Sequence, residues 1–94
     1  MPMSSSAWLL CEVLERDPER ARVKSQIVDG EEIDFVAPAN VIKDRDAAEG
    51  VWVRCESRGQ SGNVVGLVLP GPVLRLGRQI NVDISQVSFH PDPA

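Results

Sequence analysis

The segment from Val51 to Leu69 constrains the fold more than any other part of the sequence. Apolar and polar side chains alternate along residues 51–58, Gly59 and Gly62 bound a short polar segment, and the following residues up to Leu69 are mainly apolar. Alternation with a period of two is typical of a β-strand, and two such runs joined by a short glycine-containing segment predict a hairpin. The sequence therefore predicts an antiparallel hairpin with its loop at residues 59–62.

The two strands of this hairpin differ in their outward faces. In the first strand Val53 and Cys55 are expected to face the core, and Trp52 and Arg54 to face outward. The second strand, residues 64–69, is apolar on both faces, which predicts burial on both sides or contact with another molecule. For Trp52 two positions stay open, because the ring can be exposed on the outer face or can cap the core.

Shorter alternating segments flank the hairpin on both sides. Asp29 and Gly30 predict a turn between two of them, and we expect its connection to have three or five residues, because an even number would place carboxylates in the core. Gly66 predicts a bulge or bend within its strand. The additional strands are expected at residues 8–15, 21–28, 33–37 and 79–84, with a further return at 85–89 and a short helical turn within 40–49.

This pattern predicts an all-β fold, a small antiparallel β-barrel or strongly bent sheet of five to seven strands with one short helical turn. The chain has no Tyr, two Trp and two Phe, so that Val, Ile and Leu must fill its interior, which suits a pleated sheet. OB-like and SH3-like barrels share this general look, and the sequence leaves the choice between them open.

With 94 residues the chain is expected to form one domain. We expect residues 1–6 to be a flexible leader, residues 7–89 the β-barrel and residues 90–94 a flexible tail. Neither an export signal nor an apolar run long enough to span a bilayer is recognisable, so that a cytoplasmic location is expected. Cys11 and Cys55 are expected to be reduced thiols in the core.

The residues that usually carry catalysis or bind metals are sparse. The only histidine, His90, lies in the proline-flanked tail, and Cys11, Cys55 and His90 lack the spacing of a zinc site. The acidic segment 44–49 lacks the glycine of a calcium loop. We therefore expect no catalytic residue, no metal site and no cofactor.

These observations favour a non-catalytic protein-protein interaction module or a small subunit of an assembly, which docks through the outer face of the 51–69 hairpin. Self-association through the second strand is one form of this prediction. The candidate partner-binding residues are Trp52, Arg54, Arg58, Val65, Leu67 and Leu69.

Two alternatives remain open. A small barrel can bind single-stranded nucleic acid with an exposed aromatic ring flanked by arginines, although the net charge of −4 disfavours nucleic acid as a partner. A small enzyme or ligand-binding domain of unknown chemistry is the second alternative. The candidate nucleic-acid contacts are Trp52, Arg54, Arg58, Arg75 and Arg78.

Overall fold

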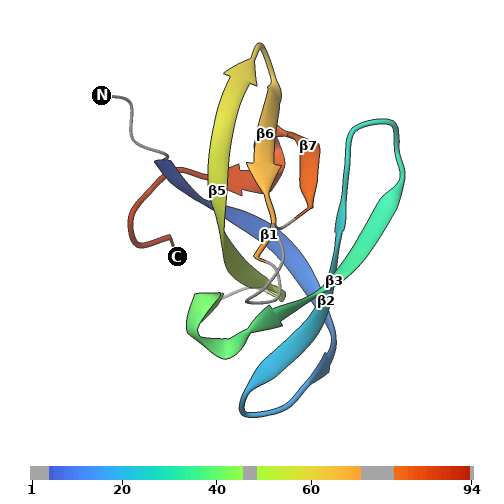
Figure 1. The fold of residues 1–94 in the computed structure, drawn as a ribbon, viewed down its shortest axis with the longest axis vertical. Coiled ribbons are helices and arrows are strands. Elements are labelled where there is room, and N and C mark those ends of the chain that lie inside the picture. Colours follow the sequence, from blue (N-terminus) through green and yellow to red (C-terminus); the bar gives the residue numbers. More distant parts are fainter. Residues whose placement is uncertain (1–4, 46–48, 71–77, 94) are drawn as a thin grey trace.

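The computed structural model describes residues 5–45, 49–70 and 78–93, which form an antiparallel sheet curled into a half-barrel (Figure 1). This confirms the predicted all-β, barrel-like fold. The described strands are β1 (Ser5–Arg16), β2 (Arg20–Gln26), β3 (Glu32–Pro38), β4 (Ile42–Asp44), β5 (Val51–Ser61), β6 (Val64–Val68), β7 (Gln79–Asp83) and β8 (Val87–Ser88). Where the helical turn was expected, within 40–49, the described residues form the end of the 3-10 turn η1 (Ala39–Val41) and strand β4, and residues 46–48 lie outside the described ranges. A second 3-10 turn, η2 (Ile84–Gln86), precedes β8.

The long strand β1 belongs to two parts of the fold. On one edge its residues from Ser5 to Cys11 pair with β5, and on the other edge Trp8 and Leu9 pair with β8 before Glu12 begins the pairing with β2. The sheet order is β3-β2-β1-β5-β6-β7, and β8 returns from β7 to β1. We call the strands β1, β5, β6, β7 and β8 the ring, and the hairpin of β2 and β3 the arm (Figure 1).

The core lies inside the curled sheet and is filled by aliphatic side chains. Leu9, Val53, Leu67 and Val82 of the ring are fully buried, and Val23 of the arm is buried with them. Burial of a side chain of this size stabilises the folded state by about 1.5–3 kcal/mol. These short branched residues therefore replace the aromatic residues that the composition lacks.

The connection between β2 and β3 has the predicted odd length. Gln26 pairs with Glu32, so that the five residues 27–31 form the loop, and Ser25 pairs with Ile33 on the inner face. Asp29 and Gly30 adopt positive φ angles of 85° and 79° in this loop. The loop also contacts the ring, because the backbone N–H of Val28 donates to the carbonyl of Asn81 at 2.9 Å.

The hairpin of β5 and β6 is longer than the sequence indicated. Strand β5 runs to Ser61, so the loop expected at residues 59–62 is in fact the short connection of Gly62 and Asn63. A bulge separates the pairs of Ser57 and Gly59, and Gly59 faces Gly66. The bend expected at Gly66 therefore lies on the facing strand, where the extra residue is inserted.

Gly50 begins the turn into β5 under a tight backbone constraint. Its φ angle is 90°, a conformation that L-residues rarely adopt, and a Cβ atom built there would lie 2.7 Å from the carbonyl oxygen of Cys11. Only glycine allows β5 to approach β1 at this point.

Both chain ends are more structured than expected where the structure describes them. Strand β1 begins at Ser5, inside the expected leader. At the other end, Asp92 forms an ion pair with Lys43 of β4, and Pro93 is buried. The segment after β8 is thus held against the rest of the fold.

Candidate interaction surface

Trp52 does not lie on an exposed surface. Its side chain is 9% exposed, and the guanidinium group of Arg45 lies 5.4 Å from the centre of its ring. It is paired across the sheet with Leu10 of β1 and Lys43 of β4, so neighbouring strands flank it on both edges. The expectation of a solvent-facing tryptophan is therefore wrong: the ring is covered, although it lies on the face of β5 opposite Val51 and Val53 and outside their core cluster.

The residues Val65, Leu67 and Leu69 also face inward, with exposures of 0%, 0% and 3%. Their orientation is fixed by β7, where Val82 pairs with Val65 and Ile80 pairs with Leu67. Directly paired residues share a face, so these three side chains complete the core instead of forming a docking surface. The expectation that they lie on the outer face of the hairpin is wrong; that face of β6 carries the half-buried residues Val64, Gly66 and Val68.

The candidate arginines are exposed but separated. Arg54 pairs in register with Trp8, and Arg58 lies at the bulge of β5 with its Nε 3.9 Å from a carboxylate oxygen of Glu56. Arg78 lies next to β7, which strand β6 separates from β5. Arg75 lies outside the described residues. The exposed tryptophan around which these arginines were expected to gather is absent from the surface.

The two cysteines are buried, free thiols, as predicted. Burial raises the pKa of Cys55 to about 12 and raises the pKa of Cys11 still further above its ordinary value. The thiolate is the reactive form of cysteine, so both side chains are held in their unreactive state at neutral pH.

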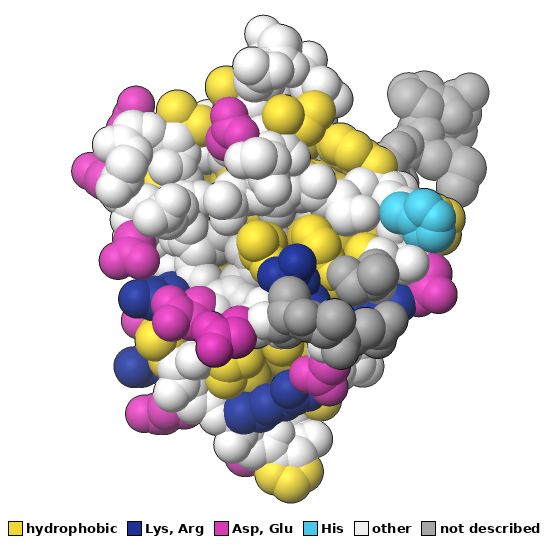
Figure 2. Space-filling view, turned by 180° about the vertical axis from the view of Figure 1, so that it is seen from behind, with side chains coloured by type: hydrophobic (Ala, Val, Ile, Leu, Met, Phe, Trp, Pro, Cys, Tyr) yellow, Lys and Arg dark blue, Asp and Glu magenta, His cyan; other side chains and the backbone are white. Residues whose placement is uncertain are grey.

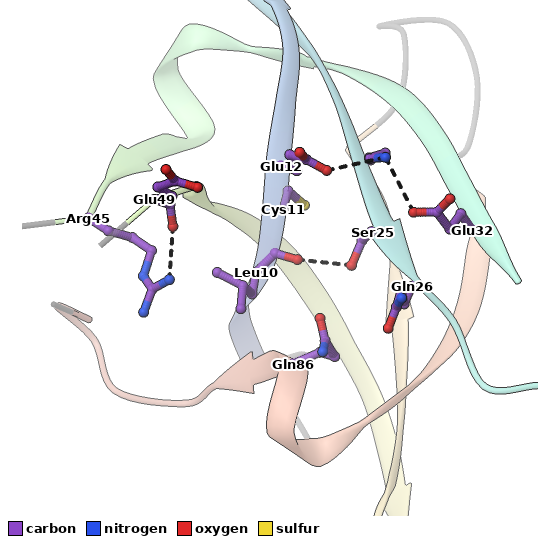
Figure 3. A pocket seen from close by; sticks show the side chains of 11 residues that line it. Leu10, Cys11, Glu12, Ser25, Gln26, Glu32, Arg45, Glu49 and Gln86 are labelled. Carbon is purple, nitrogen blue, oxygen red and sulfur yellow. Dashed lines mark hydrogen bonds and ion pairs between the residues drawn. The ribbon is translucent and has the colours of Figure 1, made fainter. Parts of the chain in front are cut away.

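A hollow of about 320 Å³ lies where β2 and β8 separate along the edge of β1 (Figure 3). Beside it the buried Ser25 hydroxyl donates to the carbonyl of Leu10 at 2.9 Å, replacing a backbone partner at the point where the strands diverge. Lys24 lies between Glu12 and Glu32, at 3.2 and 3.5 Å. These carboxylates raise the pKa of Lys24, whose ammonium group is already paired with both of them.

The outer face of the arm and of the adjoining end of β1 exposes apolar side chains. Val36 of β3 is 50% exposed, and Leu14 of β1 is 38% exposed. Leu14 is the extra residue of a bulge between the pairs of Val13 and Glu15. Sequence reasoning missed both residues. Alternation along the strand could have identified Val36, because it lies between Phe35 and Ala37, which were expected to face inward, and should therefore face outward.

Charged residues adjoin Val36 on this face. Arg22 is its direct cross-strand neighbour on β2, and the two line a hollow of about 360 Å³ together with Arg20. Asp34 precedes Val36 on the same face, opposite Lys24. Within the described part of the chain, neither Arg22 nor Asp34 forms an ion pair.

The strand β3 also has an open backbone edge, since among the described strands it pairs with β2 alone. Ile27 donates to Glu31 and Ala39 donates to Glu19, so the odd-numbered residues of this pairing direct their backbone groups toward β2. In an antiparallel pair the intervening residues point the other way. The N–H and C=O groups of Glu32, Asp34 and Val36 therefore point to the open edge.

No protein-family model, curated protein or solved structure matches this chain. In the described ranges, no helix has the length and apolar character that crossing a membrane requires. Within the same ranges, no three His, Cys, Asp or Glu side chains gather as a possible metal site.

Proposed function

We propose that this chain is a non-catalytic protein-protein interaction module, or a small subunit of an assembly, that docks through the open edge of β3 and the adjoining outer face of the arm. The observation that supports it is the free backbone edge of β3 beside the exposed Val36. An unpaired strand edge is a template for a further strand, and side chains beside it give the pairing its specificity.

The chemistry of this surface suits a protein partner. It combines backbone donors and acceptors, the exposed side chain of Val36 and charges of both signs. On the face shown in Figure 2, Lys and Arg side chains also lie among Asp and Glu side chains, and hydrophobic side chains reach the surface between them. Such mixed surfaces are typical of contacts between proteins.

Single-stranded nucleic acid is less well supported as a partner. That function was expected to use the ring of Trp52 as a stacking platform, and this ring is 9% exposed. The interspersed charges of Figure 2 also differ from the continuous basic surface that follows a phosphate backbone. Two buried free thiols suit a reducing compartment, and we propose that the module acts in the cytoplasm.

The test uses the full chain and its variants to capture binding proteins from a lysate of the cells that make it. It then compares which proteins each form retains. Val36→Lys replaces the exposed valine with a charged residue of the kind that protects strand edges, and we expect it to lose the specific partner. Quantitative mass spectrometry of the retained proteins is the measurement.

Arg54→Glu is the matched control, because it changes an exposed residue of the originally predicted hairpin surface and leaves β3 intact. A partner retained by this variant and lost by Val36→Lys supports docking through the arm. A partner that Val36→Lys retains at the level of the unchanged chain contradicts it.

A further inference from the structure

We propose that the partner at the β3 edge is a second copy of this chain, and that two β3 strands pair antiparallel around a twofold axis at Phe35. This inference rests on the proposed function, because it names the occupant of the same docking surface. The pairing joins two half-barrels through one continuous sheet.

The backbone of β3 fits this symmetry. Its groups at Asp34 and Val36 point to the open edge, as the pairing with β2 dictates. With the axis at Phe35, Asp34 of each copy lies opposite Val36 of the other, and the two residues exchange their backbone hydrogen bonds. Glu32 lies opposite Pro38 of the other copy, where the missing N–H of proline falls at the end of the pairing.

The side chains select this register over its neighbours. A register centred on Asp34 would place two carboxylates directly opposite each other, which destabilises a strand pair. A register centred on Val36 would place the two valines together and leave each Asp34 opposite Pro38. The axis at Phe35 avoids both arrangements, because Asp34 then lies opposite Val36, which has the backbone N–H that Pro38 lacks.

The same register brings together the charges that lack partners within the described part of the chain. On the outer face Arg22 lies beside Val36, and Val36 would lie beside Asp34 of the second copy. Arg22 and that aspartate are then two strand spacings apart, roughly 10 Å between backbones, a distance that their side chains can bridge over the valine. The symmetry repeats the contact, so that both arginines and both aspartates gain partners.

The inner face of the pairing is apolar. Phe35 is half-buried, and the axis places it against Phe35 of the second copy. Ile33 would lie opposite Ala37, and both belong to the hydrophobic core of the monomer. Aromatic pairs across a strand pair add to its stability. The dimer would therefore extend the core across the strand edge.

Charge reversal tests this arrangement. Asp34→Arg places an arginine between Lys24 of its own chain and Arg22 of the second copy, and we expect the dissociation constant to rise at least about tenfold. The double change of Asp34→Arg with Arg22→Asp exchanges the two charges, and we expect it to restore most of the association. Sedimentation equilibrium of the full chain from micromolar to millimolar concentration measures the mass and the dissociation constant.

Arg54→Glu serves as the control, because it reverses an exposed charge on the ring, and its dissociation constant should equal that of the unchanged chain. Circular dichroism verifies that each variant is folded, and a variant that unfolds is replaced by the milder Asp34→Asn, which should weaken association less. The inference is overturned if the chain stays monomeric at millimolar concentration. It is also overturned if a dimer forms but its dissociation constant is unchanged by Asp34→Arg and by the double change.

The two proposals fail separately. If the chain is monomeric but binds a different protein, and Val36→Lys abolishes that binding, the further inference is wrong. The proposed function then holds with that protein as the partner at the β3 edge. A dimer that responds to the charge exchange as expected supports the inference, and it identifies self-assembly as the function of this surface.

Discussion

The ring and the arm are built on the same strand, β1, but their edges end differently. In the ring, β8 returns from β7 to Trp8 and Leu9 of β1, so the sheet bends back to its first strand. In the arm, β3 ends the sheet with backbone groups that no described strand pairs. Burial alone does not distinguish the two regions, since both contribute buried residues to one core. Both regions end in a terminal strand, because β7 pairs with β6 alone, but the Asn81 carbonyl of β7 accepts a hydrogen bond from Val28, whereas no described strand covers the edge of β3.

A buried residue of the ring and an exposed residue of the arm should differ strongly in how much they stabilise the fold. Leu67→Ala removes a fully buried side chain, and we expect it to lower the free energy of unfolding by about 2–5 kcal/mol. Val36→Ala on the exposed arm face should change it by only about 0.5 kcal/mol. Urea denaturation followed by circular dichroism measures both values, and equal values would contradict the distinction between core and docking surface.

A smaller effect separates two glycines with similar backbone angles. Gly50 of the ring and Gly30 of the arm have φ angles of 90° and 79°, but only Gly50 would bring its Cβ close to another atom. We expect Gly50→Ala to cost about 2–3 kcal/mol, from strain and the contact with Cys11, and Gly30→Ala about 1 kcal/mol, from strain alone. Thermal and urea unfolding measure which variant loses more free energy of unfolding. Equal losses would mean that the close contact at Gly50 relaxes without a cost.

A weak dependence of stability on pH is expected from Asp17. Hydrogen bonds from the backbone N–H groups of Glu19 and Arg20 hold the pKa of Asp17 below 3.8 in the turn that leads to the arm. A carboxyl whose folded pKa lies below its unfolded pKa stabilises the fold above the unfolded value, and this contribution is lost as pH falls through the folded pKa.

We therefore expect Asp17→Asn to make stability less sensitive to pH below about 4, where the unchanged chain loses this contribution. Urea titrations at several pH values measure the slope. Asp83 of the ring is the comparison, because hydrogen bonds from Ser85 hold its pKa low in the same way. A steeper acid dependence in the Asp17→Asn variant than in the unchanged chain would refute this account.

The sequence predicted the inner faces of most strands, because alternation reports which side chains share a face. It placed Val53 and Cys55 inside, and it required a loop of three or five residues around Asp29 and Gly30, of which the structure has the five-residue form. The sequence did not predict the orientation of the side chains in a strand that is apolar on both faces, because the neighbouring strand determines it. Residues 64–68 have no polar side, and only the pairing with β7 shows which of them point inward.

The candidate site could be predicted only in part, for a related reason. That Val36 faces outward follows from alternation in its strand. That β3 is an edge depends on the strand order of the whole sheet, which local patterns do not contain. Likewise Trp52 is covered through Arg45 and the neighbouring strands, and nothing in its own segment indicates that cover.

The pairing of Trp8 with Ser88 has a consequence for the order in which the chain folds. During synthesis β1 emerges long before β8, so the part of its edge at Trp8 and Leu9 stays unpaired until β8 has been made. Contacts between residues so distant in sequence require closure of a long loop and generally slow folding. The hairpin of β2 and β3 contains only local pairings and can form early, so a newly made chain would present the arm before the ring is complete.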